Sequence, residues 1–377
     1  MHKIKFLVFN IKKSFIPICI CLFTMFLLIF SNANLSSAKT GLALWANSVV
    51  PSLLPFFIAT ELLGYTNVIS ILGKLLNRFM KPIFNVPGEG AFPFIMGIIS
   101  GYPMGAKIVS NFKSQGICTN EEAERLLAFT NNSGPLFIIG TVGIGLFKDT
   151  TIGILLFITH ILACLTVGFL FRFWKSSKRF EDFGDCPQNP HSTVSISNLG
   201  EVLSSSIMSA INTIFLIGGF IVLFSVIISI LENSGILDRL AHLIYPILNI
   251  FKVPASYADG IFTGLLELTN GVCSIANIAN KSISTNIIIC AFLLGFGGLS
   301  IMLQILSITS KAKISIKPYI IGKFLQGIFA AIYTYIFIYT IPFFNLNLWK
   351  KWNERGLSPF VSLFIYYQIP LCSIHCS

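Results

Sequence analysis

Long apolar stretches, separated by short polar and basic segments, dominate the hydrophobic pattern of this chain. A membrane-spanning helix needs about 20 consecutive, mostly apolar residues. Seven stretches approach or exceed this length. They are Phe15–Phe30, Leu42–Leu63, Arg125–Phe147, Thr151–Phe173, Ile207–Leu231, Asn286–Ile308 and Pro318–Pro342. The pattern therefore predicts an all-α polytopic membrane protein.

Two further apolar stretches, Ala91–Asn111 and Tyr257–Asn280, are interrupted by glycine, proline and polar residues. Each follows an amphipathic segment, Val68–Phe84 or Ile236–Phe251, in which spaced charges lie on an apolar helix. Together with the continuous stretches they give about seven to nine membrane segments.

The composition agrees with a lipid environment. Hydrophobic residues make up 54% of the 377 residues and charged residues only 11%, whereas about a quarter of the residues of a soluble protein are charged. The net charge of +11 lies in short clusters beside the apolar stretches, which is typical of cytoplasmic loops. We therefore expect a multi-pass protein of the cell membrane, with the lipid bilayer and not nucleic acid as its partner.

The basic clusters also test how the interrupted stretches cross the membrane. With the N-terminus inside, the cluster of Lys74, Arg78 and Lys81 lies inside as well. The basic region Arg172–Arg179 falls on the same side only if Ala91–Asn111 enters the membrane and returns. The charge pattern therefore predicts a re-entrant segment.

The same argument applies further along the chain. If Tyr257–Asn280 is also re-entrant, the cluster of Lys311, Lys313 and Lys317 lies inside. The two halves then follow one plan in opposite orientations.

A weak internal repeat supports this plan. At an offset of 167 residues, six of fifteen positions are identical. Ile83, Phe84, Val86, Pro87, Ala91 and Gly97 match Ile250, Phe251, Val253, Pro254, Ala258 and Gly264. Inverted repeats with discontinuous segments commonly form a binding site near the middle of the membrane.

The pattern divides the chain into five parts. Residues 1–40 form an N-terminal membrane segment, although the lysine-rich start and the apolar run also resemble a secretory signal. Residues 41–174 form the first half, 175–200 a cytoplasmic linker, 201–343 the second half and 344–377 a C-terminal tail.

The first interruption is the strongest candidate for a binding site. Proline cannot continue a helix, and glycine permits sharp turns. A helix broken within the membrane exposes backbone groups that can hold a polar solute. The alternative is a kink that only packing requires, which leaves a nearby lysine unexplained. The candidate residues are Ser100, Gly101, Tyr102, Pro103, Gly105 and Lys107.

The second interruption contains Glu267, Thr269 and Asn270. An acid between leucines in a membrane segment is costly and indicates function. The alternatives are a structural ion pair, for example with Lys107, or a protonated carboxyl group.

A third polar group, Asn131, Asn132, Ser133 and Gly134, lies inside an apolar stretch and offers both donors and acceptors. The candidate counterpart in the other half is the segment Gly295–Gly298, with Gly297 and Gly298, together with Gln304. The alternative for these residues is hydrogen bonding or close contact between helices. Glu61 and His160 are isolated polar residues in apolar stretches, and we expect them to form hydrogen bonds inside the bundle.

Motifs for enzymatic chemistry are missing from the sequence. The nine cysteines include no C-x-x-C pair, and no nucleotide-binding loop, nucleophile elbow or zinc-protease motif occurs. We predict no catalytic residues, no metal and no cofactor, and hence no enzyme.

Three motifs in order, Gly101–Lys107, Glu121–Leu127 and Asn131–Phe137, resemble the YlbJ sporulation integral membrane proteins of endospore-forming Firmicutes. The resemblance runs from about Gly41 to Tyr339. That family is grouped with the nucleoside-recognition Gate domains, which also occur in spore maturation proteins and in ferrous iron transporter B.

The resemblance implies a role in forming the spore cortex, in a membrane of a sporulating cell. The Gate label describes kinship and names no demonstrated ligand. With the paired interruptions, it favours a permease-like protein for a small polar solute. The alternative is a non-transporting scaffold that assembles cortex-building proteins. Other sporulation membrane proteins and a second copy of the chain are the candidate protein partners.

Overall fold

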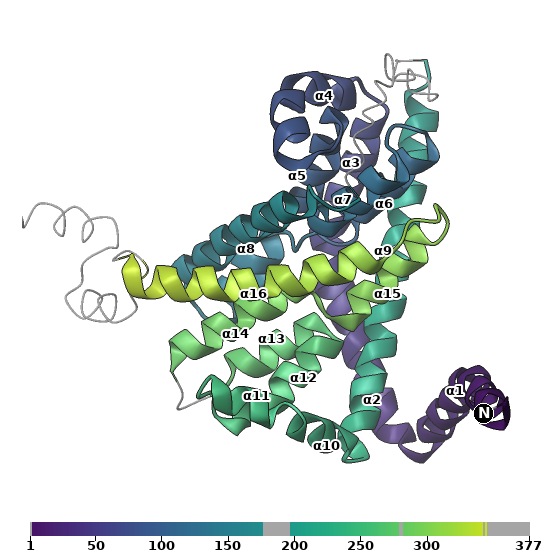
Figure 1. The fold of residues 1–377 in the computed structure, drawn as a ribbon, viewed down its shortest axis with the longest axis vertical. Coiled ribbons are helices and arrows are strands. Elements are labelled where there is room, and N and C mark those ends of the chain that lie inside the picture. Colours follow the sequence, from purple (N-terminus) through teal and green to yellow (C-terminus); the bar gives the residue numbers. More distant parts are fainter. Residues whose placement is uncertain (1, 176–196, 279–281, 342–343, 345–377) are drawn as a thin grey trace, which may run out of the picture.

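The computed structural model describes residues 2–175, 197–278, 282–341 and 344, with side chains from residue 16 onward. All secondary structure in these ranges is helical (Figure 1). Most of the predicted linker at 175–200 and of the predicted tail at 344–377 lies outside the described residues.

The first half begins with α1 (His2–Ile29), which points away from the rest of the molecule in Figure 1. The 34 residues Ser31–Gly64 then form one helical stretch. It consists of α2 (Ser31–Leu44), the π-helical η1 (Trp45–Val49) and α3 (Val50–Gly64). The remaining elements are α4 (Val68–Phe79), η2 (Met80–Phe84), η3 (Gly88–Gly90), α5 (Ala91–Ser100), α6 (Met104–Ser114), α7 (Asn120–Thr130), η4 (Leu136–Leu146) and α8 (Thr150–Phe171).

The second half repeats this order of elements. A long helix, α9 (Leu199–Asn233), packs against α2 and α3 and is followed by short helices. These are α10 (Ile236–His242), α11 (Tyr245–Ile250), η5 (Ala255–Tyr257), α12 (Ala258–Leu266) and α13 (Leu268–Ala276). Then come α14 (Ile283–Phe296), α15 (Gly298–Thr309) and α16 (Lys317–Thr340), and α16 packs across α8 and α14 (Figure 1).

Both interrupted stretches fold into helical hairpins. A Cβ atom added at Gly97 on α5 would lie 3.4 Å from the Cα atom of Gly105 on α6, so these two arms lie side by side. A Cβ atom at Gly271 on α13 would collide with the backbone of Gly264 on α12. Each interrupted stretch therefore has the shape that the charge pattern predicted, in which the chain enters and returns.

The basic clusters of the first half lie together, as a re-entrant segment requires. The Asn85 side chain, directly after η2, donates a hydrogen bond of 3.0 Å from Nδ2 to the carbonyl of Arg172. The end of η2 and the end of α8 are thereby on one side of the molecule. A full crossing at Ala91–Asn111 would have separated them.

Two stretches that were predicted as continuous spans are broken. The prediction for Arg125–Phe147 is wrong because α7 ends at Thr130 and the helix resumes only at Leu136, after non-helical residues that precede Pro135. In Asn286–Ile308, Gly297 and Gly298 have φ values of +86° and +83° and separate α14 from α15. Hydropathy alone does not detect such breaks, since the flanking residues remain apolar.

Five helices of the described chain are long and apolar enough to cross a membrane, or six if the bent pair of Val68–Phe84 and Gly88–Ser100 counts as one. The sequence count of seven to nine also included stretches that are half-helices or hairpins here. Large apolar side chains on the outer faces are exposed, for example Phe215 at 62% and Phe324 at 51%. Such faces fit lipid contact.

Candidate functional site

A cavity of about 130 Å³ lies where both hairpin turns meet the break after α7 and the helix α15. Residues of η1, α3 and α9 close its remaining sides. Seven of the predicted residues line it. They are Gly101, Tyr102, Ser133, Gly134, Glu267, Thr269 and Gln304. Residues from the two halves of the sequence thus come together around one space.

The turn of the first hairpin is shaped by Gly101, which has φ +79° and ψ −171°. Only glycine adopts this backbone conformation readily. A Cβ atom at Gly101 would also lie 3.0 Å from the backbone nitrogen of Gly134, in the break between α7 and η4. The two non-helical segments are therefore in direct backbone contact, and this contact places Tyr102 and Ser133 at the cavity.

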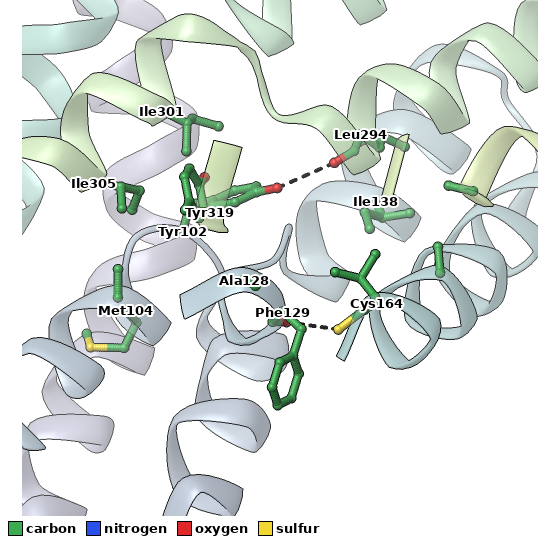
Figure 2. Packing of buried hydrophobic residues seen from close by; sticks show 14 of the residues in the cluster. Tyr102, Met104, Ala128, Phe129, Ile138, Cys164, Leu294, Ile301, Ile305 and Tyr319 are labelled. Carbon is green, nitrogen blue, oxygen red and sulfur yellow. Dashed lines mark hydrogen bonds between the residues drawn. The ribbon is translucent and has the colours of Figure 1, made fainter. Parts of the chain in front are cut away.

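The Tyr102 hydroxyl points toward the Leu294 carbonyl near the end of α14, at a long donor–acceptor distance of 3.5 Å (Figure 2). The hydroxyl of Ser133 is a close neighbour of that of Tyr102, and it is buried without a hydrogen-bond partner among the described residues. These hydroxyls can donate and accept. The first half thus supplies weakly engaged hydroxyl groups to the cavity.

From the second half, Glu267 contributes a carboxylate that is 5% exposed. It precedes α13, and Oε2 accepts a hydrogen bond of 2.8 Å from the backbone nitrogen of Asn270. The N-terminus of a helix stabilises a negative charge. Within the described chain, no basic side chain forms a salt bridge with Glu267. Thr269, which also lines the cavity, is a hydrogen-bonding neighbour of the same carboxyl group.

Lys107 does not line the cavity and does not pair with Glu267. Its Nζ atom is 2.6 Å from Oε1 of Glu61 and donates to the hydroxyls of Ser209 and Thr213 on α9. The alternative reading of Glu267 as a structural partner of Lys107 is therefore wrong, because α3 brings a different acid to α6.

Asn131 and Asn132 belong to a buried network behind the cavity. The ammonium group of Lys323 on α16 donates to the Asn131 carbonyl at 2.7 Å and to Oε1 of Gln326 at 2.6 Å. Nε2 of Gln326 donates to Oδ1 of Asn132 at 2.9 Å and lies 3.4 Å from Nε2 of His160. The helix break after α7 is thus held by side chains of α8 and α16.

Lys323 is the main functional candidate that the sequence interpretation missed. It is completely buried, and its Nζ atom lies 5.1 Å from the centre of the Tyr102 ring. The signal was present, since Lys323 and Gln326 are polar residues within the apolar stretch Pro318–Pro342. A lysine within a membrane segment indicates function in the same way as an acid does.

The remaining predicted residues support the cavity from outside it. The Ser100 hydroxyl forms a hydrogen bond of 2.8 Å with that of Thr60. Cβ atoms at Gly105 and Gly298 would approach the carbonyl groups of Thr130 and Gly264. Pro103, Asn270 and Gly297 lie at the ends of α6, α13 and α15 or within their first turns.

Metal-like clusters of three or more His, Cys, Asp or Glu side chains do not occur in the part of the chain that the structure describes. Figure 2 shows the hydrogen bond that one cysteine near the break after α7 forms. The Cys164 thiol donates a hydrogen bond of 2.9 Å to the Phe129 carbonyl.

Comparison with known families gives a clear result. The sequence profile of the Gate family, described as nucleoside recognition, matches residues 46–173 and 214–344. The chain belongs to the Gate family. One segment of the Gate match contains the first hairpin and the break after α7, and the other contains the second hairpin and the break before α15.

Among curated Gate relatives, the sporulation integral membrane protein YlbJ of Bacillus subtilis (strain 168) is 35% identical over 344 residues. The alignment covers 88% of this chain and 81% of that protein. The resemblance inferred from the three motifs is thereby confirmed, and this Gate protein is a homologue of a sporulation integral membrane protein.

Among solved structures, several forms of CNTnw are similar to this chain. The inward-facing, substrate-bound form has a TM-score of 0.48 at 16% identity and covers 76% of this chain and 74% of its own. A doubly substituted, outward-facing form has a TM-score of 0.49 at 15% identity, with coverages of 89% and 86%.

Proposed function

We propose that this Gate protein is a permease for a small polar solute, which binds in the cavity between the two hairpin turns. The observation that carries the proposal is the convergence of polar groups from both halves. Tyr102 and Ser133 of the first half line the same cavity as Glu267 and Gln304 of the second half. Polar groups are costly within a membrane, and such sites mark the paths of polar solutes.

The chemistry of the lining suggests which solutes to test first. Glu267 accepts hydrogen bonds, whereas Gln304, Thr269 and the tyrosine hydroxyl both donate and accept. Such a set suits a solute with several hydroxyl or amide groups. Nucleosides are a sensible first class, because the matched family is described as nucleoside recognition.

For the biological setting, we propose a role in forming the spore cortex. The support is the resemblance to the YlbJ sporulation proteins, whose curated member is named as a sporulation integral membrane protein. A solute moved during sporulation would then be one that cortex formation consumes or releases.

Uptake into proteoliposomes tests the proposal. Vesicles with the purified chain should accumulate radiolabelled nucleosides or another polar solute above protein-free vesicles. The Glu267→Gln variant should lose about tenfold or more of this uptake, the equivalent of one strong hydrogen bond to a charged group. Glu232→Gln is the matched control, since that exposed acid lies on α9 outside the lining.

The same variants separate the permease from a scaffold. In a sporulating host that lacks the native gene, Glu267→Gln should lower the yield of heat-resistant spores at equal protein level. Full yield with Glu267→Gln, together with no uptake of any solute by the unmodified chain, would favour the scaffold.

A further inference from the structure

A groove of about 790 Å³ lies at one end of the molecule, between α4 with η2 and the C-terminal end of α8. Among the described residues, eight line this groove, of which four are basic and four are uncharged. The lining consists of Lys74, Asn77, Arg78, Lys81, Pro82, Asn85, Arg172 and Phe173. This basic groove is separate from the solute cavity and shares no residue with it.

The fold places these cations together. Lys74, Arg78 and Lys81 recur every three or four residues and therefore share one face of the helix. Arg172 is brought to this face by the hydrogen bond from Asn85 to its carbonyl. Its guanidinium group lies over the rings of Phe169 and Phe173, at 5.4 and 5.2 Å from their centres. All four charges thus border one space.

The same helix carries an exposed apolar stripe next to its basic face. Ile71, Leu75 and Phe79 are 60%, 68% and 54% exposed and recur every four residues. The inward face of α4 is formed by the buried residues Ile69 and Gly73. A helix with an apolar stripe beside a basic one is typical of a segment that lies in a membrane interface.

We propose that the basic groove binds the phosphate headgroup of an anionic phospholipid. The cations would contact the phosphate, and the stripe of Ile71, Leu75 and Phe79 would lie among the acyl chains. A free phosphate ion would use the cations but would leave that apolar stripe without a partner. Basic pockets beside membrane helices on the cytoplasmic side commonly bind anionic headgroups.

The corresponding segment of the second half differs from α4 and η2 in its charges. In α10, Asp238 accompanies Arg239 and His242. At the offset of 167 residues, Lys74, Arg78 and Lys81 correspond to the uncharged residues Ala241, Tyr245 and Leu248. The fold repeats its interfacial helices, and the basic groove lies on the side where the positive-inside pattern places the cytoplasm. The proposed ligand therefore belongs to the inner leaflet.

Native mass spectrometry of the detergent-purified full chain tests this inference. With phosphatidylglycerol added, the unmodified chain should retain bound lipid. The triple variant Lys74→Gln, Arg78→Gln and Lys81→Gln should need about tenfold or more lipid for the same occupancy. The matched control, Lys311→Gln, Lys313→Gln and Lys317→Gln, loses the same charge from another basic cluster and should bind as the unmodified chain does.

Binding of phosphatidylcholine and competition by inorganic phosphate distinguish an anionic lipid from other ligands of the groove. Phosphatidylcholine should bind the unmodified chain and both triple variants equally, and millimolar inorganic phosphate should not displace phosphatidylglycerol. Displacement by phosphate would assign the groove to a soluble anion, and equal phosphatidylglycerol binding by the two triple variants would overturn the proposal. If the α4 variant aggregates, Arg172→Gln on α8 takes its place, with the same weakened binding expected and unchanged binding as the contradicting result.

Discussion

Lys107 of the first hairpin and Glu61 of α3 form a salt bridge with 2.6 Å between Nζ and Oε1. Both side chains are 17% exposed. Because Lys107 also donates to the Ser209 carbonyl and to two hydroxyls on α9, the ammonium group joins three helices. This group fixes the position of α6 against the long helices of both halves.

Substitution of Lys107 should destabilise the protein more than substitution of Glu61. In Glu61→Gln, the ammonium group keeps its oxygen acceptors on α9. In Lys107→Met, the Glu61 carboxylate loses its cation in a mostly buried place. We expect Lys107→Met to destabilise the protein by about 2–4 kcal/mol and Glu61→Gln by roughly half as much. Thermal unfolding in detergent measures both, and the double variant should recover part of the loss. Additive effects would contradict the coupling.

The Gly101 turn gives a second prediction. Gly101→Ala forces a side chain into a glycine-only backbone region and against the backbone of Gly134, and should cost about 2–4 kcal/mol. Gly116→Ala is the control. Its φ is also positive, at +73°, but a Cβ atom there meets nothing within 4 Å. Gly116→Ala should lower the free energy of unfolding by about 1 kcal/mol, because only the positive φ value is then unfavourable for the new side chain. Equal melting temperatures for the two variants would argue against the contact with Gly134.

Lys323 gives a third prediction. Lys323→Met leaves the Asn131 carbonyl and the Gln326 amide without their donor, and should cost about 1–3 kcal/mol. Lys323→Met combined with Gln326→Leu should lower the free energy of unfolding by less than the sum of the two single losses. The second substitution removes the Gln326 oxygen that the first one leaves without a donor. Unfolding in detergent reports both. A single variant as stable as the unmodified chain would show that the break after α7 does not depend on this donor.

The inverted plan is tested by labelling from each side of the membrane. Ser114 is the last residue of the first hairpin, and Ser256 precedes the second. In a cysteine-free background, Ser114→Cys should react with an impermeant maleimide only after the inner face is opened. Ser256→Cys should react in intact cells. Reaction of both from the same side would rule out opposite orientations.

Much of this fold follows from local chemistry. The hairpin at Gly101–Pro103 could be predicted because proline and glycine interrupt an apolar run, and because the neighbouring basic clusters allow only one orientation. The positions of Glu267 and Gln304 were apparent for a similar reason, as costly polar residues among leucines and isoleucines.

The partners of these residues could not be predicted in the same way. That Lys107 meets Glu61 and not Glu267 depends on how α3 packs beside α6, which no local pattern encodes. The break at Asn131–Gly134 was read as part of a continuous helix because its flanks are apolar. Its support comes from Lys323, which lies far along the chain.

The glycine contact inside the second hairpin limits how the cavity can be reached. At Gly271 and Gly264 the backbones of α13 and α12 are in direct contact, and Gly298 of α15 lies against the Gly264 carbonyl. Two arms in backbone contact cannot part gradually without opening a void. We therefore expect α12 and α13 to move together as one rigid body, so that the cavity opens around the hairpin and not within it.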